Sequence, residues 1–135
     1  MPPSSVTERA MTCGETARAR WKVPDSVPLA VWRIAFVLSS LYEGFPNVLV
    51  EAMCCGVPVI ATDCVSGPSE ILGPSEHGIL VPDPLRAPET EAALADAIVR
   101  LAGSDLDRAR YADRAARRAG DFDASTIIEQ WIREC

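Results

Sequence analysis

The chain has little histidine, no long apolar run and no excess of positive charge. Its formal net charge is −6 at pH 7, which argues against a binder of the nucleic-acid backbone, because such binding depends on a basic surface. No run approaches the roughly 18 apolar residues of a membrane span. The N-terminus also lacks the charged start and apolar stretch of a secretory signal peptide. We therefore expect no nucleic-acid partner and no membrane span.

The five cysteines show no CxxC spacing, and His77 is the single histidine. This pattern supports neither a disulfide framework nor a zinc site. Cys54 and Cys55 fall in a predicted helix, where adjacent side chains point apart, so packing is favoured over a redox pair. His77 precedes Gly78 at a predicted strand start, which favours a structural role over acid–base chemistry. A reducing, cytoplasmic location is the simplest interpretation.

The length and composition indicate one globular domain with an irregular first part. The chain has 135 residues, of which 48% are hydrophobic and 24% are charged, and this is enough to bury a core. Residues 1–33 show no sustained period of 2 or 3.6 and carry several prolines, which predicts an irregular or unrelated segment. Residues 34–135 are the expected folded domain.

From residue 34 onward, strands and helices are predicted to alternate. Short apolar runs predict the strands of a parallel sheet, at 34–38, 57–61 and 77–81. The first run is typical of a strand buried on both faces, and the second is also expected to be buried. Helical patterns predict the intervening and following helices, at 47–55, 67–72, 89–103, 104–119 and 123–134. Ser104 is a candidate N-cap for the fourth of these helices. The alternation predicts an α/β fold with a Rossmann-like parallel sheet and flanking helices.

Residues 43–51 contain the candidate ligand site. Glu43 and Glu51 lie eight residues apart, on either side of Gly44 and a helix start. The first N–H groups of a helix lack intrahelical partners and carry a partial positive charge, which suits a diphosphate. Three such groups belong to Asn47, Val48 and Leu49.

Gly44 and the two glutamates suit such a site, and the glutamates also have structural alternatives. Gly44 lets a ligand approach the backbone, Glu51 is suited to a ribose diol, and Glu43 can reach sugar hydroxyls. Glu51 would equally favour an early helical turn by its charge. Glu43 would equally serve as a solvated loop residue.

Residues 38–53, followed by residues 55–62, closely resemble the donor-binding half of family 4 retaining glycosyltransferases. The resemblance continues through Ser66-Gly67-Pro68, residues 78–82 and the helix that begins near Glu89, and it covers about residues 35–134. These enzymes have the GT-B fold, with two Rossmann-like domains around a cleft. The resemblance implies that this chain is the C-terminal half of such a fold, and an incomplete one.

The resemblance implies a role for each residue of the site. Glu43 opens the family's Glu-x7-Glu motif and is the catalytic candidate beside the donor sugar, while Glu51 closes the motif and binds the ribose. Gly44 and Phe45 correspond to backbone contacts with the sugar. The diphosphate contacts correspond to Asn47, Val48 and Leu49. The implied reaction transfers a hexosyl or N-acetylhexosaminyl group from a nucleoside diphosphate sugar, with UDP expected, with retention and without a metal or other cofactor.

The chain departs from the family pattern in several places. The basic Arg and Lys that hold the donor phosphates have no convincing match in residues 1–34, and the acceptor domain is missing. Arg33-Ile34-Ala35 stands where the family has an Ala-Asp pair, and Cys54 replaces a more usual Ala. The alternatives to an active enzyme are therefore a non-catalytic nucleotide-sugar-binding fragment or an inactive remnant. An exposed apolar sheet edge with poor solubility is expected.

The acceptor implied by the resemblance is a lipid-linked sugar or a polysaccharide precursor. Peripheral contact with the inner face of the membrane would then need a basic surface, and four arginines of the helix 104–119 could form one: Arg110, Arg114, Arg117 and Arg118. Nearby aspartates dilute this charge, so an ordinary solvated helix face is favoured.

Overall fold

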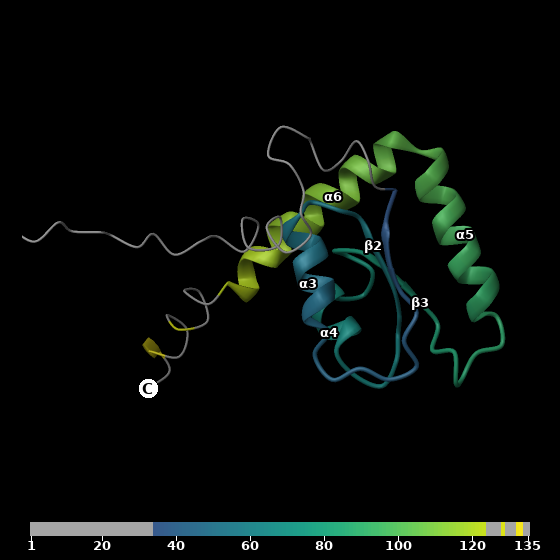
Figure 1. The fold of residues 1–135 in the computed structure, drawn as a ribbon, viewed down its shortest axis with the longest axis horizontal. Helices are drawn as coiled ribbons and strands as arrows, with labels where there is room; N and C mark the ends of the chain where they lie inside the picture. The colour runs from purple at the N-terminus through teal and green to yellow at the C-terminus, as the bar shows by residue number, and fades with distance from the viewer. Residues whose placement is uncertain (1–33, 124–127, 129–131, 134–135) are drawn as a thin grey trace, which may run out of the picture.

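The computed structural model describes residues 34–123, 128, 132 and 133 (Figure 1). Their sheet has three parallel strands in the order β1-β2-β3, namely β1 (Phe36–Leu38), β2 (Val59–Thr62) and β3 (Ile79–Val81). Val37 pairs with Ile60 in the β1–β2 register, and Ala61 pairs with Leu80 between β2 and β3. The predicted parallel sheet is confirmed.

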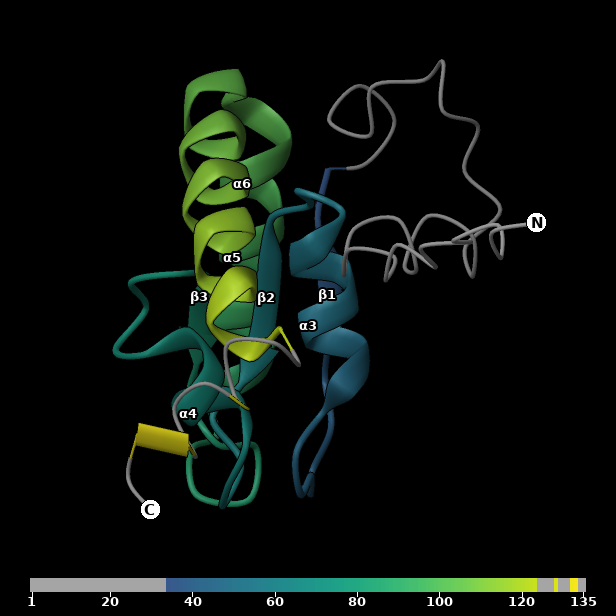
Figure 2. The same ribbon diagram turned by 90° about the vertical axis from the view of Figure 1, so that its left-hand side faces the viewer.

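Five helical elements complete the described fold: α3 (Asn47–Cys54), α4 (Pro68–Leu72), α5 (Thr90–Gly103), α6 (Asp105–Ala119) and the 3-10 turn η1 (Gly120–Phe122). Alternate residues of a strand point to opposite faces of a sheet. Val59 and Ala61 therefore face α3, α4 and α6, whereas Ile60 faces α5. Figure 1 shows α5 across the strands from α3 and α4, and Figure 2 shows α6 alongside the sheet next to α3.

Local sequence signals account for several helix ends. Gly56 follows α3 with φ +66 and donates its N–H to the Met53 carbonyl at 2.9 Å, as a C-terminal glycine does. Ser104 Oγ accepts the N–H of Asp107 at 3.1 Å, so the predicted N-cap is confirmed. Residues 124–127, 129–131 and 134 of the predicted final helix lie outside the described residues, as do residue 135 and the segment 1–33.

The prediction that the first strand is buried on both faces is wrong. Every residue of β2 is buried, but Val37 of β1 is 37% exposed and the preceding Ile34 is 49% exposed. Within the described residues, β1 pairs only with β2 and therefore lies at an edge of the sheet. An apolar run identifies a strand, but it does not encode the place of that strand in the sheet.

The cysteines in the described fold contribute mainly to packing. Cys55 and Cys64 are buried free thiols, and Cys54 and Cys55 pack near Val57 and Phe36, as predicted. Cys54 also forms a disulfide bond, which the sequence did not predict. None of the described helices combines the length and the apolarity that a membrane span requires.

Candidate functional site

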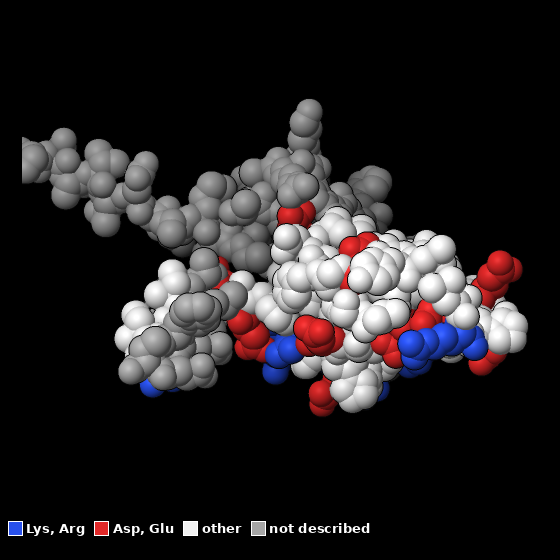
Figure 3. Space-filling model, turned by 90° about the horizontal axis from the view of Figure 1, so that it is seen from below, with Lys and Arg blue, Asp and Glu red and all other residues white. Residues whose placement is uncertain are grey.

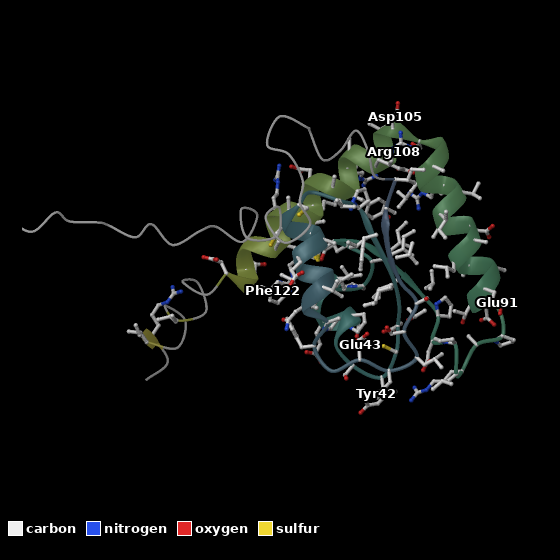
Figure 4. The ribbon with its side chains drawn as sticks, in the orientation of Figure 1. Tyr42, Glu43, Glu91, Asp105, Arg108 and Phe122 are labelled. Atoms are coloured by element: carbon white, nitrogen blue, oxygen red, sulfur yellow. The ribbon has the colours of Figure 1, made fainter. Side chains whose placement is uncertain are left out.

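The loop at residues 39–46 joins the carboxyl end of β1 to the start of α3. In open parallel sheets, ligands bind outside the carboxyl ends of the strands. Figure 4 shows Glu43 and Tyr42 at this end of the sheet, with Tyr42 directed away from the fold. Glu43 is half-buried, whereas Tyr42 is 75% exposed. The structure therefore places the predicted loop where an α/β fold binds ligands.

Three hydroxyl groups hold Glu43 and its loop. Ser40 Oγ donates to the Glu43 carboxylate Oε1 at 2.6 Å, and Ser66 Oγ donates to the Glu43 main-chain carbonyl at 2.8 Å. Thr62 Oγ1, at the carboxyl end of β2, donates to the Ser40 carbonyl at 2.5 Å. The second carboxylate oxygen of Glu43 makes no hydrogen bond within the part of the chain that the structure describes. Glu43 is thus fixed with one oxygen engaged and one available.

Ser40, Thr62 and Ser66 were missed as functional candidates. The signal that could have found them is the presence of hydroxyl residues at the end of β2 and in the loops that follow two neighbouring strands. Parallel strands bring such loops together at one edge of the sheet.

Gly67 lies directly against the backbone of the Glu43 loop. Its φ is +90, and a Cβ at this position would lie 2.3 Å from the carbonyl oxygen of Gly44 and 2.8 Å from Pro46 Cδ. Gly44 is itself exposed, and a Cβ on it would meet nothing within 4 Å. The close approach between the two loops therefore depends on the glycine at position 67. The open backbone of Gly44 is compatible with its predicted contact with a ligand.

The start of α3 offers fewer free donors than the sequence predicted. Pro46 occupies the N-cap position and is buried. The Asn47 N–H donates to the Phe45 carbonyl at 3.0 Å, and the Leu49 N–H donates to the Pro46 carbonyl at 2.9 Å. The Val48 N–H has no such backbone acceptor among the described residues. An anion at this helix end would accept directly from Val48, whereas Asn47 and Leu49 would first have to release their acceptors.

Glu51 lies one turn further along α3 and is half-buried. Its neighbours in sequence are part of the core, since Val50 is 8% exposed and Ala52 is fully buried. Its main-chain carbonyl accepts the N–H of Cys55 at 3.2 Å. The helix therefore fixes the backbone of Glu51 relative to the loop that carries Glu43.

Phe45 contacts an aromatic residue from the other end of the described chain. Its ring centroid lies 5.7 Å from that of Phe122 in η1, with an interplanar angle of 63°. The Arg118 guanidinium lies over the Phe122 ring, 4.8 Å from its centroid. The two phenylalanines are far apart in the chain, and no local pattern joins them.

The α6 arginines, for which the sequence favours an ordinary solvated face, make contacts within the fold. Arg118 donates to the Ile71 and Glu70 carbonyls, Arg117 pairs with Asp113 at 3.1 Å, and Arg114 donates to the Glu76 carbonyl at 3.4 Å. Figure 3 shows basic and acidic side chains side by side on one face of the molecule. These contacts favour the solvated-face interpretation.

His77 lies away from this loop, between α4 and β3. The main-chain N–H of His77 donates to the Leu72 carbonyl at 3.0 Å, and its imidazole Nε2 lies 3.9 Å from Glu76 Oε2. A Cβ on the adjacent Gly78 would lie 2.6 Å from Val59 Cγ2, so this turn is tightly packed, which supports the structural interpretation. Among the described residues, no group of three His, Cys, Asp or Glu is arranged to hold a metal ion.

Comparisons with known proteins identify relatives of the chain. Residues 20–104 match the family model of the group 1 glycosyl transferases. The chain is 37% identical to an uncharacterized glycosyltransferase of Methanocaldococcus jannaschii, covering 71% of this chain and 29% of that protein. It is 34% identical to N-acetylgalactosamine-N,N'-diacetylbacillosaminyl-diphospho-undecaprenol 4-alpha-N-acetylgalactosaminyltransferase of Campylobacter jejuni, covering 73% of this chain and 26% of that protein.

A solved structure supports the same assignment. The crystal structure of TarM aligns with a TM-score of 0.62 and 27% sequence identity, over 74% of this chain and 19% of that one. The family match begins at residue 20, so the boundary at residue 34 stays a prediction. The chain spans less than a third of the length of these relatives. It belongs to the group 1 glycosyltransferase family, and its parallel sheet with flanking helices resembles the GT-B fold as a partial domain.

Proposed function

We propose that this chain supplies the donor side of a glycosyltransferase. The parent reaction transfers a hexosyl or N-acetylhexosaminyl group from a nucleoside diphosphate sugar, with UDP as the nucleotide, with retention at the anomeric carbon. The observation that carries this proposal is the fixed Glu43 carboxylate, which accepts from Ser40 at the carboxyl end of β1 and directly precedes the start of α3. A carboxylate that can accept hydrogen bonds from the donor sugar therefore lies near a helix end that can bind phosphate.

Each residue of the loop then has a distinct task. The available oxygen of Glu43 accepts a hydrogen bond from a sugar hydroxyl, and the main chain of Gly44 and Phe45, which are both exposed residues, lines the same sugar. The Val48 N–H donates to the diphosphate, and the partial positive charge of the helix end stabilises the leaving group without a metal ion. Glu51 accepts from the ribose diol.

Asn47 and Leu49 join the phosphate site only after rearrangement of the first turn. Their N–H groups donate to Phe45 and Pro46 carbonyls in this structure. Each of these hydrogen bonds must be broken before its N–H can donate to the diphosphate, and this loss offsets part of the binding free energy. Tight diphosphate binding therefore requires a change in the backbone of residues 45–47.

A second candidate function is binding of the nucleotide sugar without catalysis. The chain spans 29% and 26% of the length of two relatives. A cleft enzyme positions its acceptor with a second wall, and loss of that orientation removes much of the rate acceleration. A third possibility, an inactive remnant, is favoured only by the occupied N–H groups of Asn47 and Leu49.

The acceptor class follows from one relative. The name of the Campylobacter jejuni protein specifies a sugar on diphospho-undecaprenol, and we extend this to a lipid-linked sugar or a polysaccharide precursor as the acceptor of the parent reaction. Such an acceptor would place the protein at the cytoplasmic face of a membrane. The contact would be peripheral.

Radiolabelled UDP-glucose and UDP-N-acetylglucosamine test these functions with the full chain. Equilibrium dialysis measures binding, and product formation is measured with and without an undecaprenyl-linked sugar acceptor. Turnover supports the enzyme, and binding without turnover supports the non-catalytic module. A chain that binds neither UDP-sugar nor UDP contradicts both and leaves the inactive remnant.

A further inference from the structure

The contact between Phe45 and Phe122 joins the candidate donor loop to the C-terminal end of α6. The rings meet edge to face, with centroids 5.7 Å apart and an interplanar angle of 63°, which is a favourable aromatic geometry. Phe122 lies beyond residue 104, where the family match ends. The contact between Phe45 and Phe122 therefore involves a residue outside the region that matches the family.

Arg118 fixes the Phe122 side of this contact. Its guanidinium covers the Phe122 ring at 4.8 Å and pairs with Asp121 at 2.9 Å. The same group donates to the Ile71 carbonyl at 3.0 Å and to the Glu70 carbonyl at 2.9 Å. The planar guanidinium thus ties η1 to the end of α4, because its donors point in fixed directions.

The core joins α6 to the helix that follows the donor loop. Ala115 and Ala119 of α6 are buried in the same cluster as Leu49 and Met53 of α3, and Phe122 packs against this cluster. Small residues let two helices approach closely. The contact between Phe45 and Phe122 therefore connects a short loop to a rigid body.

The Phe45 main chain is connected to the proposed phosphate and sugar contacts. Its carbonyl accepts the Asn47 N–H at 3.0 Å, and the residue before it is the exposed Gly44. Phe45 is 47% exposed, and the Phe122 ring packs against its ring in edge-to-face geometry. Movement of this ring would move the adjacent Gly44 backbone, whereas α3 is held in the core through Leu49 and Met53.

We propose that Phe122 is a positioning residue of the donor site, acting through Phe45 to fix the loop that contacts the donor sugar. This inference rests on the proposed function and deepens it. According to this inference, η1 supports the part of the site that contacts the donor sugar and does not support the part that contacts the ribose. Loss of the Phe122 ring then weakens recognition of the sugar moiety while nucleotide recognition is retained.

The test compares the affinities for UDP and UDP-sugar in the full-length chain, by isothermal titration calorimetry. Phe122→Leu removes the ring and keeps apolar bulk, and it should reduce the preference for UDP-sugar over UDP by roughly two- to tenfold. Its UDP affinity should remain within about twofold of wild type. Phe122→Tyr keeps the aromatic ring and should keep the preference. If Phe122 only filled apolar space, the aromatic ring itself would not be needed for the preference.

Phe36→Leu is the matched control, since it makes the same change in β1, and it should leave the preference unaltered. An unaltered preference in Phe122→Leu, or an equal loss for UDP and UDP-sugar, overturns the inference alone. Wild-type protein that binds neither compound overturns the proposed function, and the inference with it.

Fluorine NMR tests the contact itself. The chain has three phenylalanines, so 4-fluorophenylalanine labelling gives three resonances, which single leucine variants assign. Phe122→Leu should move the Phe45 resonance in the absence of ligand and leave that of Phe36 in place. UDP-sugar should shift the Phe45 and Phe122 resonances together. A Phe45 resonance that is insensitive to Phe122→Leu contradicts the proposal.

Discussion

The Gly44 carbonyl oxygen lies 2.3 Å from the position that a Cβ on Gly67 would occupy. This relationship brings the loop after β2 against the loop after β1, at the carboxyl edge of the sheet. Ser66 is adjacent to Gly67 and donates to the Glu43 carbonyl at 2.8 Å. The placement of Glu43 therefore depends on a glycine and a serine that lie more than twenty residues further along the chain.

Gly67→Ala should destabilise the fold by about 2 kcal/mol or more, because it combines a positive φ with a backbone clash. Gly56→Ala is the matched control, since Gly56 has φ +66 and a Cβ there would meet nothing within 4 Å. The control should lose only about 1 kcal/mol from strain. Urea unfolding measures both free energies. Equal losses in the two variants would show that the contact with Gly44 is not tight.

Ser40→Ala removes the hydrogen bond to Glu43 Oε1. The carboxylate then loses its orientation, and we expect the affinity for UDP-sugar to fall by about three- to tenfold while UDP affinity is unchanged. Ser40→Thr keeps the hydroxyl and should restore most of the loss. Ser69→Ala, in α4, serves as the control. Titration calorimetry measures the affinities for UDP and UDP-sugar. If the affinity for UDP fell as much as that for UDP-sugar, Ser40 would not act on the sugar contact.

The ion pair between Arg100 and Asp107 predicts a pH dependence of stability. The Arg100 Nε lies 2.8 Å from Asp107 Oδ2, and this hydrogen bond lowers the pKa of Asp107 below its usual value. A group whose pKa is lower in the folded state stabilises the fold above its unfolded-state pKa. That contribution is lost as the pH falls through the folded-state value.

A double-mutant cycle with Arg100→Gln and Asp107→Asn measures this effect. The coupling between the two residues should be favourable at pH 7, where Asp107 is ionised, and should decline below about pH 4. Chemical unfolding at a series of pH values provides the four free energies. Coupling that is constant between neutral and strongly acidic pH would contradict the ionic origin of the interaction.

The sequence was sufficient to predict those elements that depend on local chemistry. The pattern of the run at residues 57–61 identified a fully buried strand, Gly56 marked the end of α3, and Ser104 marked the start of α6. Each of these signals is complete within one turn or one strand.

Features that depend on distant parts of the chain were not predicted. The exposure of Val37 reflects the edge position of β1, which the order of strands decides. Phe122 reaches Phe45 only because α6 packs on α3. Tertiary packing sets both of these features. The acceptors of the Asn47 and Leu49 N–H groups are local, at Phe45 and Pro46, and were missed because the residue types at a helix start do not reveal how its first turn is closed.

The most direct test of the account is UDP binding by the full chain and by Glu51→Gln, measured by titration calorimetry. Glu91→Gln is the control, because Glu91 lies in the first turn of α5, across the sheet from α3. We predict that wild type and Glu91→Gln bind UDP equally and that Glu51→Gln binds about tenfold or more weakly, through loss of the charged acceptor for the ribose diol. Equal UDP affinity in all three proteins, or no binding by wild type, would contradict the assignment of this site to a nucleotide sugar.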